Sequence, residues 1–276
     1  MDLKKLCTRT LSGIIYIAII VGCILGGEST VMGLACLFSL LAVIEFSKIC
    51  SEFSKERIPT IILDVAGCIC LSLAGYWPFF GFPILLWIIV ILARLVEELY
   101  LSDGNPLKSI ALSLMTQVYI GVPMGCMVAI SSFFDKPAIL LAVFIFIWLN
   151  DTGAFLVGSL LGRHRLFERI SPKKSWEGFF GGLGFTIGSA FLFRYCFSSF
   201  FGLGTDTYLW IGLAIVVTVF ATWGDLFESM LKRNLKIKDS GNLIPGHGGI
   251  LDRIDSLLFV APAVFLYLLS FSFLGV

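Results

Sequence analysis

Long apolar runs recur along the whole chain and alternate with short polar segments. A transmembrane helix needs about 20 mainly apolar residues, and this pattern predicts an all-α polytopic membrane protein of about nine such helices. Only Tyr76, Trp77 and Pro78 divide the third run from the fourth, so eight or ten helices remain open alternatives. The expected spans are 11–26, 31–49, 59–77, 79–97, 109–132, 137–160, 178–198, 207–228 and 256–274.

Composition supports a membrane protein independently of the pattern. Hydrophobic residues make up 58% of the chain and charged residues only 14%, whereas an ordinary soluble domain carries about 25% charged residues. A soluble core of this size could not bury so much apolar surface, so the composition excludes a soluble globular domain.

The distribution of basic residues predicts the orientation in the membrane, because cytoplasmic loops collect Lys and Arg. With nine spans and a cytoplasmic N-terminus, all but Lys136 and Arg194 of the 20 basic residues fall on the inside. We therefore expect a cytoplasmic N-terminus and a C-terminus outside. A cytoplasmic (inner) membrane would then carry an active site that faces the cytoplasm.

Polar side chains concentrate in the second half of the chain. We expect a single integral membrane domain over 1–276, in which helices of 1–135 act as a scaffold and a candidate dimer interface. The longest polar inner loops are 161–177 and 229–255. Chemistry is therefore expected in 136–276.

The segment from Asp225 onward carries a carboxylate, a hydroxyl and an ammonium at helical spacing. Asp225, Ser229 and Lys232 lie at i, i+4 and i+7, which places them on one helical face. This arrangement predicts one wall of a polar site that leads from the membrane into the loop. The alternative is a snorkelling lysine neutralised by an aspartate.

Two further aspartates follow a glycine-rich turn. Asp252 and Asp255 are three residues apart, so a helix that begins there places both on one side. Together with Asp225 they would form an all-oxygen site suited to magnesium. The preceding His247, Gly248 and Gly249 would let backbone N–H groups approach an anion, although His247 could also be a hydrogen-bonded loop histidine.

A second anion-binding element is predicted in ISPKKSWEG, where Lys173, Lys174 and Ser175 precede the next span. The alternative is that these lysines only enforce topology or contact anionic lipid. Asp151 lies in the middle of a span, where a carboxylate is costly and is usually functional or part of a buried pair.

Other polar or glycine-rich positions are expected to be structural. Glu45, Asp64 and Arg94 favour structural or interfacial roles. The glycines of GFFGGLGFTIG, residues 178–188, are typical of close helix packing and not of a nucleotide-binding loop.

Residues 225–255, written GD–ES–KR–KD–PGHGGILDRID, resemble the defining motif of the CDP-diacylglycerol synthases, or phosphatidate cytidylyltransferases. The upstream NDTGAF and SPKKSWEG segments are also similar, so the resemblance covers 148–256 well. The N-terminal half is similar only in hydropathy and length. The matching positions are Ser229, Lys232, Arg233, Lys238, Asp239, Gly241, Pro245, His247, Gly248, Gly249, Asp252, Arg253 and Asp255.

The resemblance implies an enzyme that joins CTP to phosphatidic acid, giving CDP-diacylglycerol and pyrophosphate for phospholipid biosynthesis. It implies Mg²⁺ on Asp225 and Asp252, with K⁺ as a candidate second ion, and a homodimer of nine-helix subunits in the lipid bilayer. No nucleic-acid partner is expected. The expected catalytic residues are Lys232, Arg233, Asp255, His247 and Ser229. The expected substrate-binding residues are Lys173, Lys174, Ser175, Gly248, Gly249, Lys238, Arg253 and Asp151.

Two alternative functions remain open from the sequence. A CTP-dependent polyprenol or phytol kinase would use the same ligands but transfer the γ-phosphate, and labelled CTP separates the two reactions. An ion-coupled transporter would use Asp151 and Asp225 as relay carboxylates, but it would need no nucleotide and would leave the glycine-rich 229–255 segment unexplained.

Overall fold

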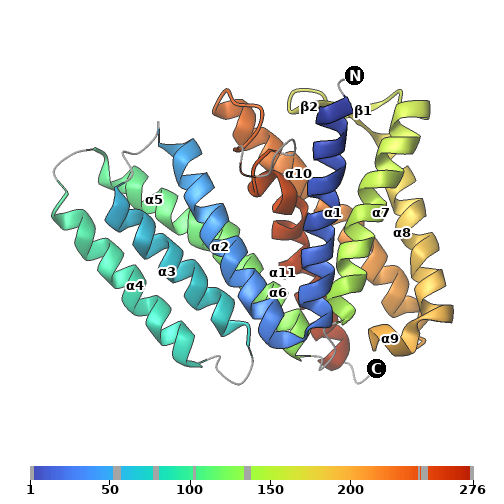
Figure 1. The fold of residues 1–276 in the computed structure, drawn as a ribbon, viewed down its shortest axis with the longest axis horizontal. Helices are drawn as coiled ribbons and strands as arrows, with labels where there is room; N and C mark the ends of the chain where they lie inside the picture. The colour runs from blue at the N-terminus through green and yellow to red at the C-terminus, as the bar shows by residue number, and fades with distance from the viewer. Residues whose placement is uncertain are drawn as a thin grey trace. The chain divides into compact units, whose positions relative to one another are not determined.

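Helices provide nearly all of the regular structure of the protein (Figure 1). The computed structural model describes residues 3–51, 57–76, 81–101, 104–133, 138–241, 243 and 248–273. The helices are α1 Leu3–Leu25, α2 Glu28–Cys50, α3 Ile58–Ala74, α4 Gly81–Leu99, α5 Pro106–Thr116, the π-helix η2 Gln117–Gly121, α6 Val122–Phe133, α7 Ala138–Leu161, α8 Trp176–Cys196, α9 Ser198–Phe201, α10 Thr207–Asn234 and α11 Leu251–Phe273.

The helical, membrane-type character predicted from the hydropathy pattern is confirmed. Each of the predicted spans falls on a helix, and the third and fourth runs form two separate helices, α3 and α4. By length and composition, five helical stretches of the described chain are suited to cross a membrane. They are Glu28–Cys50, Pro106–Ser132, Ala138–Leu161, Thr207–Asn234 and Leu251–Ser272. A total of nine crossings, and the sides on which the termini lie, remain predictions.

Two helix ends extend beyond the predicted spans. Helix α10 continues past residue 228 to Asn234 and has Lys232 and Arg233 in its last turn. Helix α11 begins at Leu251, with Asp252 in its first turn. Cations near a helix C-terminus and anions near an N-terminus interact favourably with the helix dipole, so these polar residues extend the helices and do not end them.

The described residues form two compact units. The first consists of residues 1–133 and 235–254. In it, α2 packs on α3 and α6, and Phe46 lies 5.9 Å from Tyr119 between ring centroids. The backbones of α3 and α6 approach each other so closely that a Cβ on Gly75 would overlap the carbonyl oxygen of Gly125.

Asp64 and Arg94, two buried polar residues of the first unit, have polar partners within it, as expected for structural residues. Ser113 donates a hydrogen bond to Asp64 at 2.5 Å, and Gln117 of the π-helix donates to the Asp64 carbonyl oxygen at 3.1 Å. Arg94, only 2% exposed, pairs with Glu98 at 2.7 Å and donates to Ser113 at 3.0 Å. The structural role expected for Asp64 and Arg94 is therefore confirmed.

The second unit consists of residues 134–234 and 255–276, and its helices α7, α8 and α10 pack on one another. A Cβ at Gly178, Gly181 or Gly182 would crowd or overlap atoms of α7, namely Ala154 O, Val157 and Asn150 Oδ1. The prediction of close helix packing is confirmed for these three glycines, whereas a Cβ on Gly184 or Gly188 would meet open space.

The polar loop between α7 and α8 contains a small β-hairpin that the sequence analysis did not predict. Strand β1 Arg165–Phe167 pairs antiparallel with β2 Ser171–Ser175. The Trp176 N–H donates to the His164 carbonyl oxygen at 2.9 Å and so continues the pairing to the start of α8. The hairpin gives the basic loop a defined conformation.

Candidate functional site

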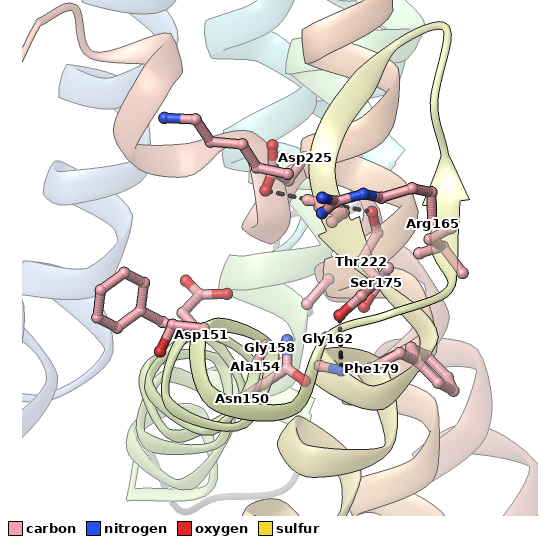
Figure 2. Close-up of a pocket in the computed structure, with 17 residues that line it drawn as sticks. Asn150, Asp151, Ala154, Gly158, Gly162, Arg165, Ser175, Phe179, Thr222 and Asp225 are labelled. Carbon is pink, nitrogen blue, oxygen red and sulfur yellow. Dashed lines mark hydrogen bonds and ion pairs between the residues drawn. The ribbon is translucent and has the colours of Figure 1, made fainter.

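Helices α7, α8 and α10 and the β-hairpin enclose a cavity of about 570 Å³ in the second unit (Figure 2). Figure 2 shows Asp151 and Asp225 approaching the cavity from α7 and α10, and Arg165 from β1. The polar residues that line it carry both signs of charge. They are Asn150, Asp151, Ser159, Arg165, Lys173, Lys174, Ser175, Thr222 and Asp225.

An ion pair joins the hairpin to α10 at this cavity. The Lys174 Nζ lies 2.6 Å from Asp225 Oδ2, and the side chains are 24% and 39% exposed. Lys174 Nζ also donates to the Thr222 carbonyl oxygen at 3.5 Å, and Ser229 Oγ donates to Asp225 Oδ1 at 3.3 Å. The structure thus brings together Lys174, Asp225 and Ser229, which the sequence analysis placed in two separate elements.

Ser175 has a defined structural role at the edge of the cavity. Its hydroxyl accepts a hydrogen bond from the Gly178 N–H at 3.1 Å and caps α8, and the residue is only 4% exposed. An N-cap serine satisfies a backbone donor that the helix leaves unpaired. Substrate binding by Ser175 stays a prediction.

Glu177 fixes the base of the hairpin. Its carboxylate accepts hydrogen bonds from the backbone N–H groups of Arg163 and His164 at 3.1 and 3.2 Å, and it lies 2.6 Å from His164 Nδ1. The hydrogen bond with the His164 side chain, followed by those with the backbone, lowers the pKa of Glu177 to about 2. The carboxylate therefore stays ionised and keeps the hairpin closed throughout the neutral range.

The last turns of α10 hold a second ion pair. Lys232 Nζ lies 2.5 Å from Glu228 Oε2, with side chains 15% and 4% exposed. Ser229 contacts Asp225, in agreement with their helical spacing, whereas Lys232 pairs with Glu228. The sequence contained this signal, because a glutamate four residues before a lysine is a favourable helical pair. Arg233 is exposed near the end of the helix.

Asp255 lies where α11 approaches α10. A Cβ on Gly224 would overlap the Asp255 carbonyl oxygen, and the Ser256 Oγ donates to the Ala221 carbonyl oxygen at 3.3 Å. The Asp255 side chain accepts a hydrogen bond from the Ser256 N–H at 2.6 Å. The absence of a side chain at Gly224 is what permits this close approach.

The glycine-rich segment belongs to the first unit up to Ile254. The Asp252 Oδ2 accepts hydrogen bonds from the Ser240 N–H at 3.0 Å and the Gly249 N–H at 2.9 Å. Gly248 has a φ of 85°, which a residue with a side chain rarely adopts. His247 lies outside the described residues.

Lys238 and Arg253 are exposed, and their contact with an anionic substrate stays a prediction. The Arg253 backbone carbonyl accepts a hydrogen bond from the Tyr16 hydroxyl of α1 at 3.1 Å. Helix α1 therefore holds the first turn of α11 while the Arg253 side chain faces outward.

Carboxylates and carbonyl oxygens are the only strong metal-ligand types that line the cavity, and they suit a hard cation. Within the described ranges, no three His, Cys, Asp or Glu side chains gather into a complete ligand set. Magnesium, however, usually binds through one or two carboxylates, with water and substrate phosphate completing its shell. The donor set around Asp225 therefore fits magnesium that binds together with a phosphate ligand.

Among the cavity residues that the sequence analysis did not predict, Arg165 and Asn150 have the strongest polar character. Arg165 was counted only as a basic loop residue, and its position facing the cavity depends on the hairpin. Asn150 is 3% exposed, and its Oδ1 has no hydrogen-bond partner among the described residues. The sequence did contain a signal for Asn150, because it lies beside Asp151 within a predicted span and polar side chains are rare in spans.

Comparison with known proteins agrees with this geometry. A model of the cytidylyltransferase family matches residues 7–271. The chain belongs to this family. The family match includes the N-terminal helices, whereas the motifs alone supported the resemblance over 148–256.

Individual relatives in the family are similar over nearly their whole length. A phosphatidate cytidylyltransferase of Staphylococcus haemolyticus (strain JCSC1435) is 33% identical over 268 residues, which cover 95% of this chain and 98% of the relative. A protein of the same name from Staphylococcus epidermidis (strain ATCC 12228 / FDA PCI 1200) is 34% identical over 266 residues, and one from Staphylococcus aureus (strain COL) is 32% identical over 267, both with the same coverage.

Proposed function

We propose that this protein transfers CMP from CTP to phosphatidic acid, producing CDP-diacylglycerol and pyrophosphate for phospholipid biosynthesis. Membership in the cytidylyltransferase family and relatives named phosphatidate cytidylyltransferase support this function. The observation that carries it is the cavity beside α7 and α10, which Arg165, Lys173 and Lys174 line together with Asp225, and in which Lys174 pairs with the Asp225 carboxylate.

The reaction joins two anions, so the main task of the site is positioning and charge neutralisation. A phosphate oxygen of phosphatidic acid attacks the α-phosphorus of CTP. The bond from that phosphorus to the oxygen bridging to the β-phosphate breaks, and pyrophosphate leaves with the electron pair. A phosphate monoester is largely ionised at neutral pH, so the attacking oxygen needs no strong general base.

The basic residues neutralise the charge that accumulates on the phosphates. Lys174 lies at the cavity next to Asp225 and would bind the triphosphate, and Arg165 and Lys173 line the same cavity. We propose that Lys232 and Arg233, assisted by Lys174, neutralise the negative charge that develops on the leaving pyrophosphate. A charge-assisted hydrogen bond is roughly twice as strong as a neutral one.

We assign magnesium to the carboxylates of Asp225 and Asp252, with Asp255 supporting them and K⁺ as a candidate second ion. When bound, magnesium would withdraw negative charge from the phosphates. In the structure, Lys174 forms an ion pair with Asp225, and Ser229 donates a hydrogen bond to it. The Asp252 carboxylate accepts hydrogen bonds from two backbone N–H groups. These contacts orient both carboxylates.

The remaining site residues are assigned to substrate contact. Gly248 and Gly249, with Lys238 and Arg253, would bind anionic groups of the substrates, and Ser175 and Asp151 are assigned to substrate contact at the cavity. Ser229 would orient Asp225 through the hydrogen bond that the structure contains. His247 is assigned to ligand contact beside the glycines.

The apolar helices place the protein in a membrane. We propose that it is a homodimer in the cytoplasmic (inner) membrane, with nine crossings and a cavity that faces the cytoplasm. Phosphatidic acid would then enter sideways from the inner leaflet and leave its acyl chains in lipid, while CTP would enter from the aqueous side.

Two differently labelled samples of CTP test the reaction. Purified protein is incubated with phosphatidic acid, magnesium and CTP labelled either in the cytosine base or in the γ-phosphate. The proposal predicts base label in the lipid extract and γ-label in released pyrophosphate. Transfer of γ-label to a polyprenol, with no base label in lipid, would identify a lipid kinase instead.

A further inference from the structure

A buried carboxylate of the N-terminal helices contacts both Ser240 and Ile250. The name 240–250 loop is used here for the described residues of this segment, which are 240, 241, 243 and 248–250. Glu45 lies in α2 and is only 7% exposed. Its Oε1 accepts a hydrogen bond from the Ser240 hydroxyl, and its Oε2 accepts one from the Ile250 N–H at 2.7 Å. One side chain therefore holds both the entry and the exit of the loop.

Two glycines leave the space that Glu45 occupies. A Cβ at Gly241 would lie 2.9 Å from the Glu45 Cδ, and a Cβ at Gly249 would overlap Oε1. Glycine permits close approach because it has no Cβ. At these two positions of the glycine-rich segment, the small residues therefore make room for a protein carboxylate.

Asp252 depends on the same two loop ends. Its Oδ2 accepts from the N–H groups of Ser240 and Gly249, the residues that contact or adjoin Glu45. If the entry and exit of the loop separate, Asp252 loses the two donors that set its orientation. Glu45 is thus connected to Asp252 through backbone groups and does not need to touch a substrate.

Within the described residues, no lysine, arginine or histidine forms an ion pair with Glu45, so backbone and hydroxyl donors provide its polar contacts. Hydrogen bonds to an ionised acceptor are short and strong, and an unmatched buried N–H carries a desolvation cost. Removal of the Glu45 carboxylate should therefore free the Ile250 N–H in particular.

We propose that Glu45 is a positioning residue for nucleotidyl transfer: it closes the base of the 240–250 loop and thereby orients Asp252. The proposal rests on the metal-binding role proposed above for Asp252. Glu45 contacts Ser240 and Ile250 from α2, whereas the sequence analysis favoured a structural or interfacial role for it.

Substitution by methionine and by glutamine separates positioning from charge. Glu45→Met keeps the length but removes both acceptors. Glu45→Gln removes the charge, but its amide can still accept from Ile250 and donate to Ser240 Oγ. Asp64→Leu is the matched control, because Asp64 is equally buried in the same unit and contacts Ser113 and Gln117 instead of the loop.

The first readout is amide hydrogen exchange in the purified full-length protein. We expect the Gly249 and Ile250 amides to exchange about tenfold faster or more in Glu45→Met, since their hydrogen bonds open. Glu45→Gln and Asp64→Leu should stay within about threefold of wild type at these amides. If the Ile250 amide of Glu45→Met exchanges at the same rate as in the wild-type protein, the proposal is overturned.

The second readout is the magnesium concentration that gives half-maximal activity. We expect it to rise about fivefold or more in Glu45→Met, and to rise less in Ser240→Ala, which removes one donor only. Glu45→Gln and Asp64→Leu should resemble wild type. Ser240→Ala also provides the test if Glu45→Met does not fold, and an unchanged magnesium requirement in it would then overturn the proposal.

Asp252→Asn separates failure of this inference from failure of the proposed metal site. If Asp252→Asn keeps wild-type activity, the metal assignment fails and the positioning role fails with it. If Asp252→Asn is inactive while Glu45→Met behaves as wild type, only the positioning role fails. If Glu45→Gln is as impaired as Glu45→Met, charge and not positioning is what Glu45 supplies, which also contradicts the proposal.

Discussion

Lys174 of β2 and Asp225 of α10 form an ion pair with 2.6 Å between Nζ and Oδ2. Both side chains are partly exposed, and such pairs contribute about 0–1 kcal/mol to stability. The pair therefore has little value for folding. It places a cation that can bind phosphate next to a carboxylate that can bind metal, and substitutions here should change chemistry more than stability.

Asp225→Asn should lower turnover by about 10²-fold or more, because it removes an anionic ligand from the proposed metal site. Thermal unfolding should shift little, since the lost ion pair is partly exposed. Asp206→Asn is the matched control, because Asp206 caps the opposite end of the same helix and asparagine caps equally well. Activity of Asp225→Asn close to that of Asp206→Asn would remove Asp225 from the site.

Lys174→Ala should lower kcat/KM for CTP by about tenfold or more, because it removes a charge-assisted bond to the triphosphate. Lys174→Arg should restore only part of this loss, since a planar guanidinium replaces a compact ammonium. Arg169→Ala, in the exposed turn of the same hairpin, should be neutral. If Lys174→Ala stays within about twofold of wild type, Lys174 serves topology and not binding.

Arg165 and Arg163 provide a comparison within one loop. Arg165 lines the cavity, whereas Arg163 does not and contributes its backbone N–H to Glu177. Arg165→Ala should lower kcat/KM by about tenfold for an anionic substrate, and Arg163→Ala should leave it nearly unchanged. Initial rates at varied CTP and varied phosphatidic acid would identify the affected substrate. Equal effects of the two variants would argue against the cavity.

Helix positions could be predicted from the sequence because apolar length is a local property. The Ser229–Asp225 contact also followed from helical spacing, and the same spacing could have identified Glu228 as the partner of Lys232. The hairpin was not predicted, because its strands are short and mostly polar.

The contact between Glu45 and Ser240 was the least predictable of the contacts that the structure describes. Glu45 and Ser240 are 195 positions apart in the chain, and no local pattern connects them. A buried glutamate in an apolar helix indicates only that a partner exists. Identification of that partner requires the tertiary structure. The sequence analysis interpreted the glycine-rich turn as an anion-binding element and did not predict that Gly241 and Gly249 leave space for Glu45.

The predicted topology can be tested with single cysteines in a variant that lacks the native eight. Arg169→Cys and Thr205→Cys both place a thiol at an exposed position. A membrane-impermeant maleimide should label position 169 only from the cytoplasmic face and position 205 only from the opposite face. Labelling of both from the same side would contradict the orientation assigned from the basic residues.

The fate of the cytosine ring tests the central claim most directly. Wild-type protein and Asp225→Asn are purified in parallel and incubated with phosphatidic acid, magnesium and base-labelled CTP, and the lipids are then extracted. The account predicts that wild type transfers the base label to a lipid that migrates as CDP-diacylglycerol, with one pyrophosphate released per lipid formed, and that Asp225→Asn transfers about 10²-fold less. Base label that remains entirely in the aqueous phase with active wild-type protein would contradict nucleotidyl transfer.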